Sequence, residues 1–269
     1  MEQVIAKVAG QLVKSRHAIA LTGAGLSTES GIPDFRGPNG IWTKNPEAER
    51  QAYESYYKFQ RDPRQYWVES LTGASWLTAL FKARPNAGHD ALAQLESLSI
   101  LKCVVTQNID NLHQKAGSKK VLDYHGNISL LRCFECNARF DPEEYDLERL
   151  LAQNRLPPLC RRCNGVLKSD VVHFNEAIPP DVARESLEEV ERCDLMLICG
   201  TSATVYPFAM LPRTAKQNNY RQKTVIIEIN ADPTPLTREG ISDDLLQGKT
   251  GEILPRILEE VQKLKAAGR

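Results

Sequence analysis

The chain has 269 residues, of which 42% are hydrophobic, enough for one large α/β domain or a core domain with a smaller insertion. Lys plus Arg number 34, and so do Asp plus Glu, so the net charge is near zero. A neutral chain lacks the electrostatic footprint of a protein that binds nucleic acid or an anionic membrane. No apolar run reaches the roughly 20 residues of a membrane helix, and the first residues lack the pattern of a secretory signal.

The seven cysteines bear on the compartment of the protein. Four of them form two close pairs, and the other three, Cys103, Cys193 and Cys199, stand in apolar stretches. An odd number with this spacing suits a reducing compartment and one metal site better than a disulfide scaffold. We therefore expect a cytoplasmic protein.

Helical patterns alternate with short apolar runs along the chain. The first residues predict an amphipathic helix with Val4, Val8 and Leu12 on one stripe. A run typical of a buried strand follows at 18–21, and helical spacing of apolar residues follows at 91–98. Further apolar runs occupy 101–106, 195–199 and 225–229, as expected for parallel strands buried on both faces. This alternation predicts an α/β fold with a doubly wound, Rossmann-like parallel sheet.

Two segments break this alternation. Residues 37–84 are rich in Tyr, Trp, Gln and charge and predict helices, whereas residues 126–168 carry the paired cysteines. We interpret both as insertions that form a smaller lobe, which leaves 1–36, 85–125 and 169–269 for the sheet domain. Ligands of doubly wound sheets bind beyond the carboxyl ends of the strands, so we expect the site between that edge and the lobe.

A glycine-rich turn follows the first strand. In the run TGAGLS at residues 22–27, glycines allow a tight turn and let backbone N–H groups approach a pyrophosphate. Thr28 stands where the usual dinucleotide motif has a third Gly, so a plain strand-to-helix turn is an equally open interpretation. The continuation adds a rigid Pro33, an acidic Asp34, an aromatic Phe35 that could cover a sugar, and an Arg36 that could pair with phosphate.

The run GAGLSTESGIPDFRG resembles the cofactor loop of the sirtuin family, and further family motifs extend the resemblance from about residue 16 to about residue 257. The resemblance implies an NAD-dependent protein-lysine deacetylase that transfers the acyl group to ADP-ribose and releases nicotinamide. Implied partners are acylated-lysine proteins or peptides, with no specific nucleic acid and no membrane. In this loop the implied NAD-binding residues are Gly23, Ala24, Gly25, Ser27, Thr28, Pro33, Asp34, Phe35 and Arg36.

A polar run, TQNID at residues 106–110, ends the second predicted strand, and His125-Gly126 follows. Asn and Asp at a strand end ordinarily cap a helix or shape a turn, and a lone His is ordinarily structural. Both runs match sirtuin motifs, however. The resemblance implies that Gln107 contacts the nicotinamide ribose, that Ile109 and Asp110 hold the carboxamide, and that Asn108 orients the ribose or a water. It makes His125 the general base.

His89 and His113 also lie outside these motifs. We expect His89 to be structural and His113 to lie on a helix surface.

The pairs Cys133-x-x-Cys136 and Cys160-x-x-Cys163 suit a tetrahedral zinc site. Four thiolates leave no open coordination position, so the zinc is expected to be structural. A nucleic-acid-binding zinc ribbon is the alternative, supported by Arg161, Arg162 and Lys168. Insertion within a cofactor-binding domain and the neutral charge of the chain argue against it.

Two later segments complete the predicted cofactor site. Gly200, Thr201 and Ser202 end the third long strand, where they could donate to phosphate or simply cap a helix. They match the family's GTS motif. The resemblance also places Asn230 at the adenosine ribose and Thr250 near the adenine.

Residues 171–176, VVHFNE, resemble the family's substrate strand, against which an acyl-lysine peptide pairs edge to edge. The Val172 backbone would accept the lysine amide N–H, and Phe174 would line the acyl tunnel. The family usually has Gly where Asn175 stands, which bears on peptide selectivity. The implied substrate-binding residues are Val172, His173, Phe174, Asn175 and Glu176.

The acyl preference follows from a second departure. Relatives that prefer succinyl and malonyl groups carry a Tyr and, three residues on, an Arg, and the matching positions here are Ser70 and Gly73. Neither can hold a distal carboxylate, so we expect removal of acetyl and poor removal of succinyl. Alternatives are a preference for longer acyl groups, NAD-dependent mono-ADP-ribosyl transfer, and an NAD-sensing binding module, against which the intact His125 argues.

Overall fold

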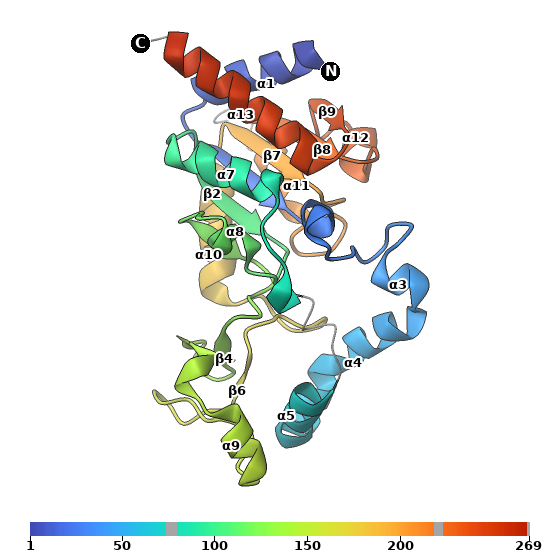
Figure 1. Ribbon diagram of the computed structural model, residues 1–269, viewed down its shortest axis with the longest axis vertical. Coiled ribbons are helices and arrows are strands. Elements are labelled where there is room, and N and C mark those ends of the chain that lie inside the picture. The colour runs from blue at the N-terminus through green and yellow to red at the C-terminus, as the bar shows by residue number, and fades with distance from the viewer. Residues whose placement is uncertain (74–79, 218–222, 268–269) are drawn as a thin grey trace.

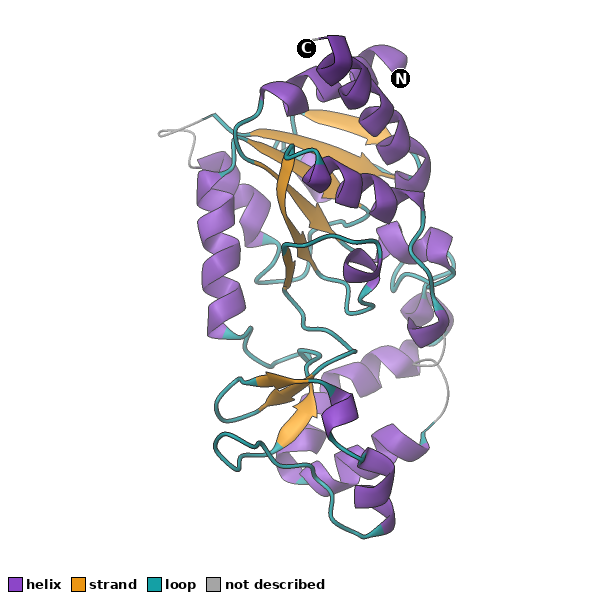
Figure 2. Ribbon diagram, turned by 60° about the vertical axis from the view of Figure 1, so that its left-hand side comes forward, coloured by secondary structure: helices purple, strands orange, loops and turns teal. Residues whose placement is uncertain are grey.

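The computed structural model describes residues 1–73, 80–217 and 223–267. It has two lobes, which Figure 1 shows one above the other: a large lobe built on a six-stranded sheet and a small lobe built on a three-stranded sheet and helices. Both chain termini lie in the large lobe, far from the small one (Figures 1 and 2).

The large sheet is parallel throughout and has the order β3-β2-β1-β7-β8-β9. The predicted doubly wound fold is therefore confirmed. From β1 the order runs outward to β3 on one side and from β7 to β9 on the other, so the topological switch point lies between β1 and β7. The strands are β1 (Ala18–Thr22), β2 (Leu101–Thr106), β3 (Val121–Asp123), β7 (Leu195–Cys199), β8 (Val225–Asn230) and β9 (Asp244–Gln247).

Helices cover both faces of this sheet, which explains why its central strands are apolar without alternation. Ala20 and Leu197 belong to one buried cluster, whereas Leu21 and Ile198 belong to the cluster on the opposite face. The first face is covered by α1 (Glu2–Lys14), α7 (Ala87–Ser97) and α13 (Thr250–Ala267), and the second by α10 (Pro180–Arg192), α11 (Met210–Gln217) and α12 (Pro235–Arg238).

The predicted helices are present with small shifts. Val8 and Leu12 of α1 are fully buried, and Val4 packs at the margin of the same cluster. In α7, Leu92 and Leu95 are buried, and Leu98 caps the helix rather than extending it. Within the described residues, no helix combines the length and the apolar character needed to cross a membrane.

The small lobe joins the two predicted insertions. The first insertion contributes α3 (Ile41–Lys44), α4 (Pro46–Arg61) and α5 (Pro63–Thr72), and the second contributes η2 (Pro142–Glu144), α9 (Leu147–Ala152) and the antiparallel strands β4 (Leu131–Cys133), β5 (Arg139–Phe140) and β6 (Leu167–Ser169). Trp67 of α5 packs in one cluster with Leu131 and Leu167, and its indole N–H donates to the Leu167 carbonyl at 2.7 Å. This tryptophan ties the helices to the small sheet, which Figure 2 shows side by side.

The expectation that His113 lies on a helix surface is wrong. The helix that carries it, α8 (Leu112–Lys115), has only four residues and contacts α7, which leaves His113 1% exposed. Its Nε2 lies 2.9 Å from Thr22 Oγ1, and its ring centroid lies 5.0 Å from that of His89, which is itself buried. Burial holds the pKa of His113 well below its usual value.

Candidate active site

The glycine-rich turn after β1 packs directly against the turn after β7. Gly23 precedes the short helix α2 (Ala24–Ser27), which leads into η1 (Thr28–Ser30). Gly25 N–H donates to the Gly200 carbonyl at 2.8 Å, and a Cβ on Gly25 would lie 2.8 Å from that oxygen. Gly200 itself has a φ of 63°, a left-handed conformation that suits glycine. The glycines are therefore required for the contact between the two turns.

A network of hydrogen bonds joins the end of β2 to this turn. The Asn108 amide donates to the Gly23 carbonyl and to Ser27 Oγ, each at 3.0 Å. Ser27 Oγ in turn donates to Asp110 at 2.7 Å, and the other Asp110 oxygen accepts the Leu112 N–H at 2.9 Å. Asp110 is 4% exposed, and desolvation raises its pKa although both oxygens accept hydrogen bonds. Sequence positions 83 residues apart thus meet at one sheet edge.

A second set of contacts links β2, β7 and β8. Thr201 Oγ1 donates to Gln107 Oε1 at 2.6 Å, and the Asn230 amide donates to the Thr201 carbonyl at 3.3 Å. Asn230 and Thr201 are each 7% exposed. Gln107, Thr201 and Asn230 therefore lie together at the carboxyl ends of β2, β7 and β8, on both sides of the switch point.

The loop after η1 reaches from the large lobe toward the small one. Asp34 Oδ1 accepts the Gly37 N–H at 2.9 Å, which closes a turn after Pro33. Phe35 is 43% exposed, and its ring centroid lies 4.7 Å from that of Trp42 on α3. The Arg36 guanidinium lies 4.5 Å from the Trp42 ring and 3.3 Å from Glu49 of α4.

The remaining predicted cofactor residues lie at the same edge or beside it. Thr28 Oγ1 donates to the Gly25 carbonyl at 2.9 Å, and Ser202 Oγ lies 3.2 Å from Thr204 Oγ1. The Ile109 carbonyl accepts the Ile128 N–H at 2.9 Å. Thr250, the first residue of α13, is 3% exposed, and its hydroxyl has no hydrogen-bond partner among the described residues.

His125 follows β3 and is partly buried beside aromatic rings. Its ring centroid lies 5.7 Å from that of Tyr124 and 6.2 Å from that of Phe208. Burial lowers the pKa of His125 to about 4, although a hydrogen bond with the Gln107 backbone opposes the shift. The imidazole is therefore neutral near pH 7 and able to accept a proton.

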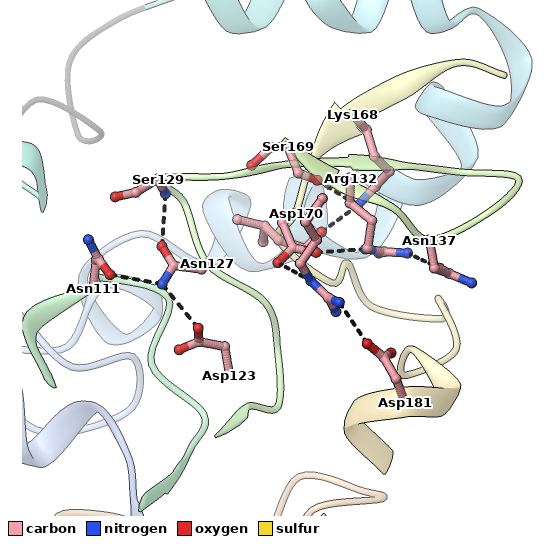
Figure 3. Close-up of polar contacts among 12 residues, drawn as sticks. Asn111, Asp123, Asn127, Ser129, Arg132, Asn137, Lys168, Ser169, Asp170 and Asp181 are labelled. Atoms are coloured by element: carbon pink, nitrogen blue, oxygen red, sulfur yellow. Dashed lines mark hydrogen bonds and ion pairs between the residues drawn. The ribbon is translucent and has the colours of Figure 1, made fainter. Parts of the chain in front are cut away.

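Polar side chains hold the chain in place on either side of His125. Burial raises the pKa of Asp123 to about 6, and its carboxylate accepts the Gln114 amide at 2.9 and 3.0 Å and the Asn127 amide at 3.1 Å. Asn127 also donates to Asn111 at 3.0 Å, and Figure 3 shows Asn127 between Asn111 and Asp123. These contacts fix the chain on both sides of His125.

Residues 171–176 do not form a strand, contrary to that expectation. Apart from the Val172 N–H, which donates to the His125 carbonyl at 2.8 Å, their backbone forms an irregular turn. Asn175 has a φ of 67° in this turn. Asn adopts the left-handed region more readily than most residues, so it can replace the usual glycine without changing the backbone.

Aromatic side chains of the helical insertion surround Phe174. Ring centroids of Tyr53 on α4 and Trp42 on α3 lie 4.3 and 5.6 Å from that of Phe174. His173 Nε2 lies 2.9 Å from the hydroxyl of Tyr66 on α5. The sequence analysis did not assign Trp42, Tyr53 or Tyr66 to the site. The high aromatic content of 37–84 was the available signal, but it did not say which rings face Phe174.

The four paired cysteines converge at one end of the small sheet. Their Sγ atoms all lie within 4.8 Å of one another, with Cys133 and Cys163 3.4 Å apart and Cys136 and Cys160 3.7 Å apart. The Cys160 sulfur also accepts the Arg162 N–H at 3.3 Å. Such spacing matches the roughly 3.8 Å between sulfurs that tetrahedral bonds of about 2.3 Å require, so the cluster can hold a metal ion.

Comparison with known proteins places these features in one family. Residues 23–207 match the Sir2 family. The chain is 41% identical to NAD-dependent protein deacylase 2 of Pyrobaculum aerophilum, over 95% of each chain, and 40% identical to the NAD-dependent protein deacetylase of Saccharolobus solfataricus, over 96% of this chain and 97% of the other. A solved structure described as a Sir2 homolog–NAD complex is 40% identical, covers 96% of this chain and 94% of the other, and has a TM-score of 0.76.

The chain therefore belongs to the Sir2 family, and the resemblance predicted from its motifs is confirmed.

Proposed function

We propose that this protein is an NAD-dependent protein-lysine deacetylase, which transfers the acyl group of a modified lysine to ADP-ribose and releases nicotinamide. The proposal depends on one observation. Ser27, Asn108 and Asp110 form one hydrogen-bond network at the carboxyl ends of the strands, beside the switch point. The neutral His125 follows the neighbouring strand of the same sheet. Related proteins are named NAD-dependent protein deacylases and deacetylases.

The residues at this edge fit NAD. The buried Thr250 hydroxyl is unpartnered among the described residues, and the Asp110 carboxylate and Asn230 amide are held in place beside the turns. When bound, NAD supplies the nicotinamide leaving group and the ribose hydroxyls that receive the acyl group. Asn108 and Asp110 would orient the nicotinamide end, and Asn230 and Thr250 would hold the adenosine end.

His125 would act as the general base. A neutral imidazole can take a proton from a ribose hydroxyl, and such catalysis typically contributes about 10²–10⁴-fold in rate. Phe174, with the rings of Trp42 and Tyr53 against it, would form an apolar wall along the acyl-lysine side chain.

We propose that the four-cysteine cluster binds one structural zinc ion. Four thiolates complete a tetrahedral shell, so the metal would stabilise the small lobe and take no part in catalysis. All seven cysteines are free, and Cys103, Cys193 and Cys199 are buried. Free thiols support the proposal of a reducing, cytoplasmic location.

The cations near the cysteines argue against a nucleic-acid-binding ribbon. Lys168 is fully buried in ion pairs within the protein. Arg161 pairs with Glu144 at 2.8 Å and stacks on Tyr145 at 4.8 Å. Two of the three cations that supported the alternative are therefore occupied by contacts inside the lobe.

For the acyl group, we propose acetyl over succinyl. Ser70 and Gly73, at the end of α5, are exposed, and Ser70 Oγ donates to the Tyr66 carbonyl. Arg64, a cation that could otherwise serve, donates to Asn154 Oδ1 at 3.1 Å. A buried carboxylate without a partner is costly, so succinyl-lysine should be excluded.

The test incubates the protein with NAD and matched acetyl-lysine and succinyl-lysine peptides, and mass spectrometry follows both peptide and nucleotide products. Free lysine with O-acetyl-ADP-ribose supports the proposal. ADP-ribosylated protein without deacylation would instead identify a mono-ADP-ribosyltransferase. A succinyl kcat/KM equal to or above the acetyl value would overturn the acyl preference.

A further inference from the structure

A buried ion cluster lies where the chain leaves the small sheet for the predicted substrate segment. Arg132 of β4 and Lys168 of β6 supply the cations, and Asp170 and Glu176 supply the carboxylates. Each of these four side chains is at most 4% exposed. Arg132 Nε lies 2.8 Å from Asp170 Oδ1, although the two are not aligned as a hydrogen bond. Figure 3 shows Arg132, Lys168 and Asp170 converging on one point.

An outer layer continues the cluster toward the large lobe. Arg139 of β5 lies 3.1 Å from Asp170 and 2.7 Å from Asp181, which is on α10. The cluster therefore connects all three strands of the small sheet to a helix of the large lobe, directly beside residues 171–176.

Glu176 points into this cluster. Its Oε1 accepts Arg132 Nη2 at 2.6 Å, and its Oε2 lies 3.1 Å from Lys168 Nζ. The same Oε2 accepts the His173 N–H at 2.9 Å. The carboxylate is thus held by two cations while it holds the backbone of the segment that the sirtuin resemblance assigns to the substrate.

That segment is fixed at four points. At one of them the Val171 carbonyl accepts a hydrogen bond from Lys168 Nζ at 2.5 Å. Glu176 N–H donates to the His173 carbonyl at 3.1 Å, so Glu176 closes the turn with both its backbone and its side chain. The His173 ring contacts Tyr66 of α5 at 2.9 Å. The Val172 N–H donates to the His125 carbonyl at 2.8 Å. Loss of the Glu176 contact would free the end of the turn farthest from His125.

A buried ionic cluster is a poor way to gain stability. Removing charges from water offsets most of their mutual attraction, and apolar side chains of similar volume often stabilise a fold as well or better. What the charges provide is a fixed geometry, because each partner constrains the others.

We propose that Glu176 is a positioning residue for the acyl-lysine substrate: held by Arg132 and Lys168, it fixes the turn at residues 173–176 so that the peptide backbone meets a preformed edge beside His125. The inference rests on the proposed deacetylase function. It also gives the small sheet a part in substrate binding, because both cations come from its strands.

The test compares the parent with Glu176→Gln. Since a charge-assisted hydrogen bond is lost, the KM for the acetyl-lysine peptide should rise about tenfold or more, whereas the KM for NAD should stay unchanged. Hydrogen exchange of amides 171–176 should be faster by a similar factor. The control is Glu239→Gln, which makes the same chemical change in a surface ion pair between Glu239 and Arg213. It should change neither the peptide KM nor the hydrogen exchange of amides 171–176.

A second variant separates positioning from folding. Glu176→Gln leaves buried cations uncompensated and can destabilise the lobe, so the double variant Glu176→Gln with Lys168→Met removes one buried charge of each sign. Because Lys168 Nζ also donates to the Val171 carbonyl at 2.5 Å, Lys168→Met alone is measured beside it. The double variant should recover the thermal stability of the parent and show a peptide KM well above that of Lys168→Met. A peptide KM that returns to the parent value together with stability would overturn the proposal.

Two other outcomes would also overturn it. Unchanged exchange of amides 171–176 would mean that Glu176 does not hold the turn, whatever the kinetics. Faster exchange with an unchanged peptide KM would mean that the turn does not position the substrate. If the parent shows no deacetylation, the proposed function fails separately. Fluorescence anisotropy of a labelled acetyl-lysine peptide then decides between parent and Glu176→Gln, and equal affinity or no binding counts against the positioning role.

Discussion

Acidification tests the proposal that His125 is the general base. The pH dependence of kcat/KM reports the ionisation of essential groups in the free enzyme. Burial lowers the pKa of His125 to about 4, whereas an unperturbed histidine titrates near 6.5. At pH 5.5 a base with a pKa of 6.5 would be only about one-tenth deprotonated, but a base with a pKa of about 4 would remain almost fully deprotonated. We therefore expect kcat/KM to change little between pH 7.5 and pH 5.5.

The assay measures kcat/KM for NAD at saturating acetyl-lysine peptide across this range, with mass-spectrometric detection of deacetylated product. A tenfold fall centred near pH 6.5 in the folded enzyme would refute the argument that burial keeps His125 neutral. His125→Ala supplies the residual rate, which should not titrate with this group.

Folding must be followed at each pH, because the same shift affects stability. The unfolded chain takes up a proton at His125 near pH 6.5, but the folded protein does so only near pH 4. The free energy of unfolding therefore loses about 1.4 kcal/mol per pH unit from this group as pH falls from 6.5 toward 4. His173, whose pKa burial also lowers to about 4, acts in the same direction. Urea denaturation should show a smaller loss between pH 7 and pH 5 in His125→Gln than in the parent.

Three further predictions concern single residues. His125→Ala should lose about 10²–10⁴-fold in kcat while NAD affinity, measured by calorimetry, changes little; turnover within a few-fold of the parent would remove His125 from the base role. Metal analysis should find one zinc per chain, and Cys160→Ser should lose the zinc and lower the melting temperature, since structural zinc contributes folding energy; zinc-free parent protein of full stability would contradict this. Asn175→Gly should leave the free energy of unfolding nearly unchanged, whereas Asn175→Ala should lower it by about 1 kcal/mol. The reason is the φ of 67° at this position, a left-handed conformation that Gly and Asn adopt more readily than Ala. Equal stability of the two Asn175 variants in urea denaturation would show that the backbone relaxes.

Local patterns were sufficient for the four central strands of the large sheet and for the cysteine cluster, but they did not predict the edge strands β3 and β9. A strand such as Leu195–Cys199 is buried on both faces, so its sequence is apolar without interruption and can be recognised alone. The two CxxC pairs carry their own spacing, and a four-ligand site needs only that the pairs meet. The resemblance to family motifs predicted the residues of the site at the strand ends. Those residues lie in short turns directly after the strands, so each motif is contiguous in the sequence.

The sequence did not determine the contacts between segments that lie far apart along the chain. His113 is a polar residue on a short helix and was therefore expected at the surface. Only the packing of α8 against α7 buries it. Tyr66 meets His173 across 107 positions, and Arg132 meets Glu176 across 44. No periodicity or spacing encodes such pairs. They follow from how two insertions fold against each other, because the burial of Trp67 and the mutual neutralisation of buried charges are properties of the assembled lobe.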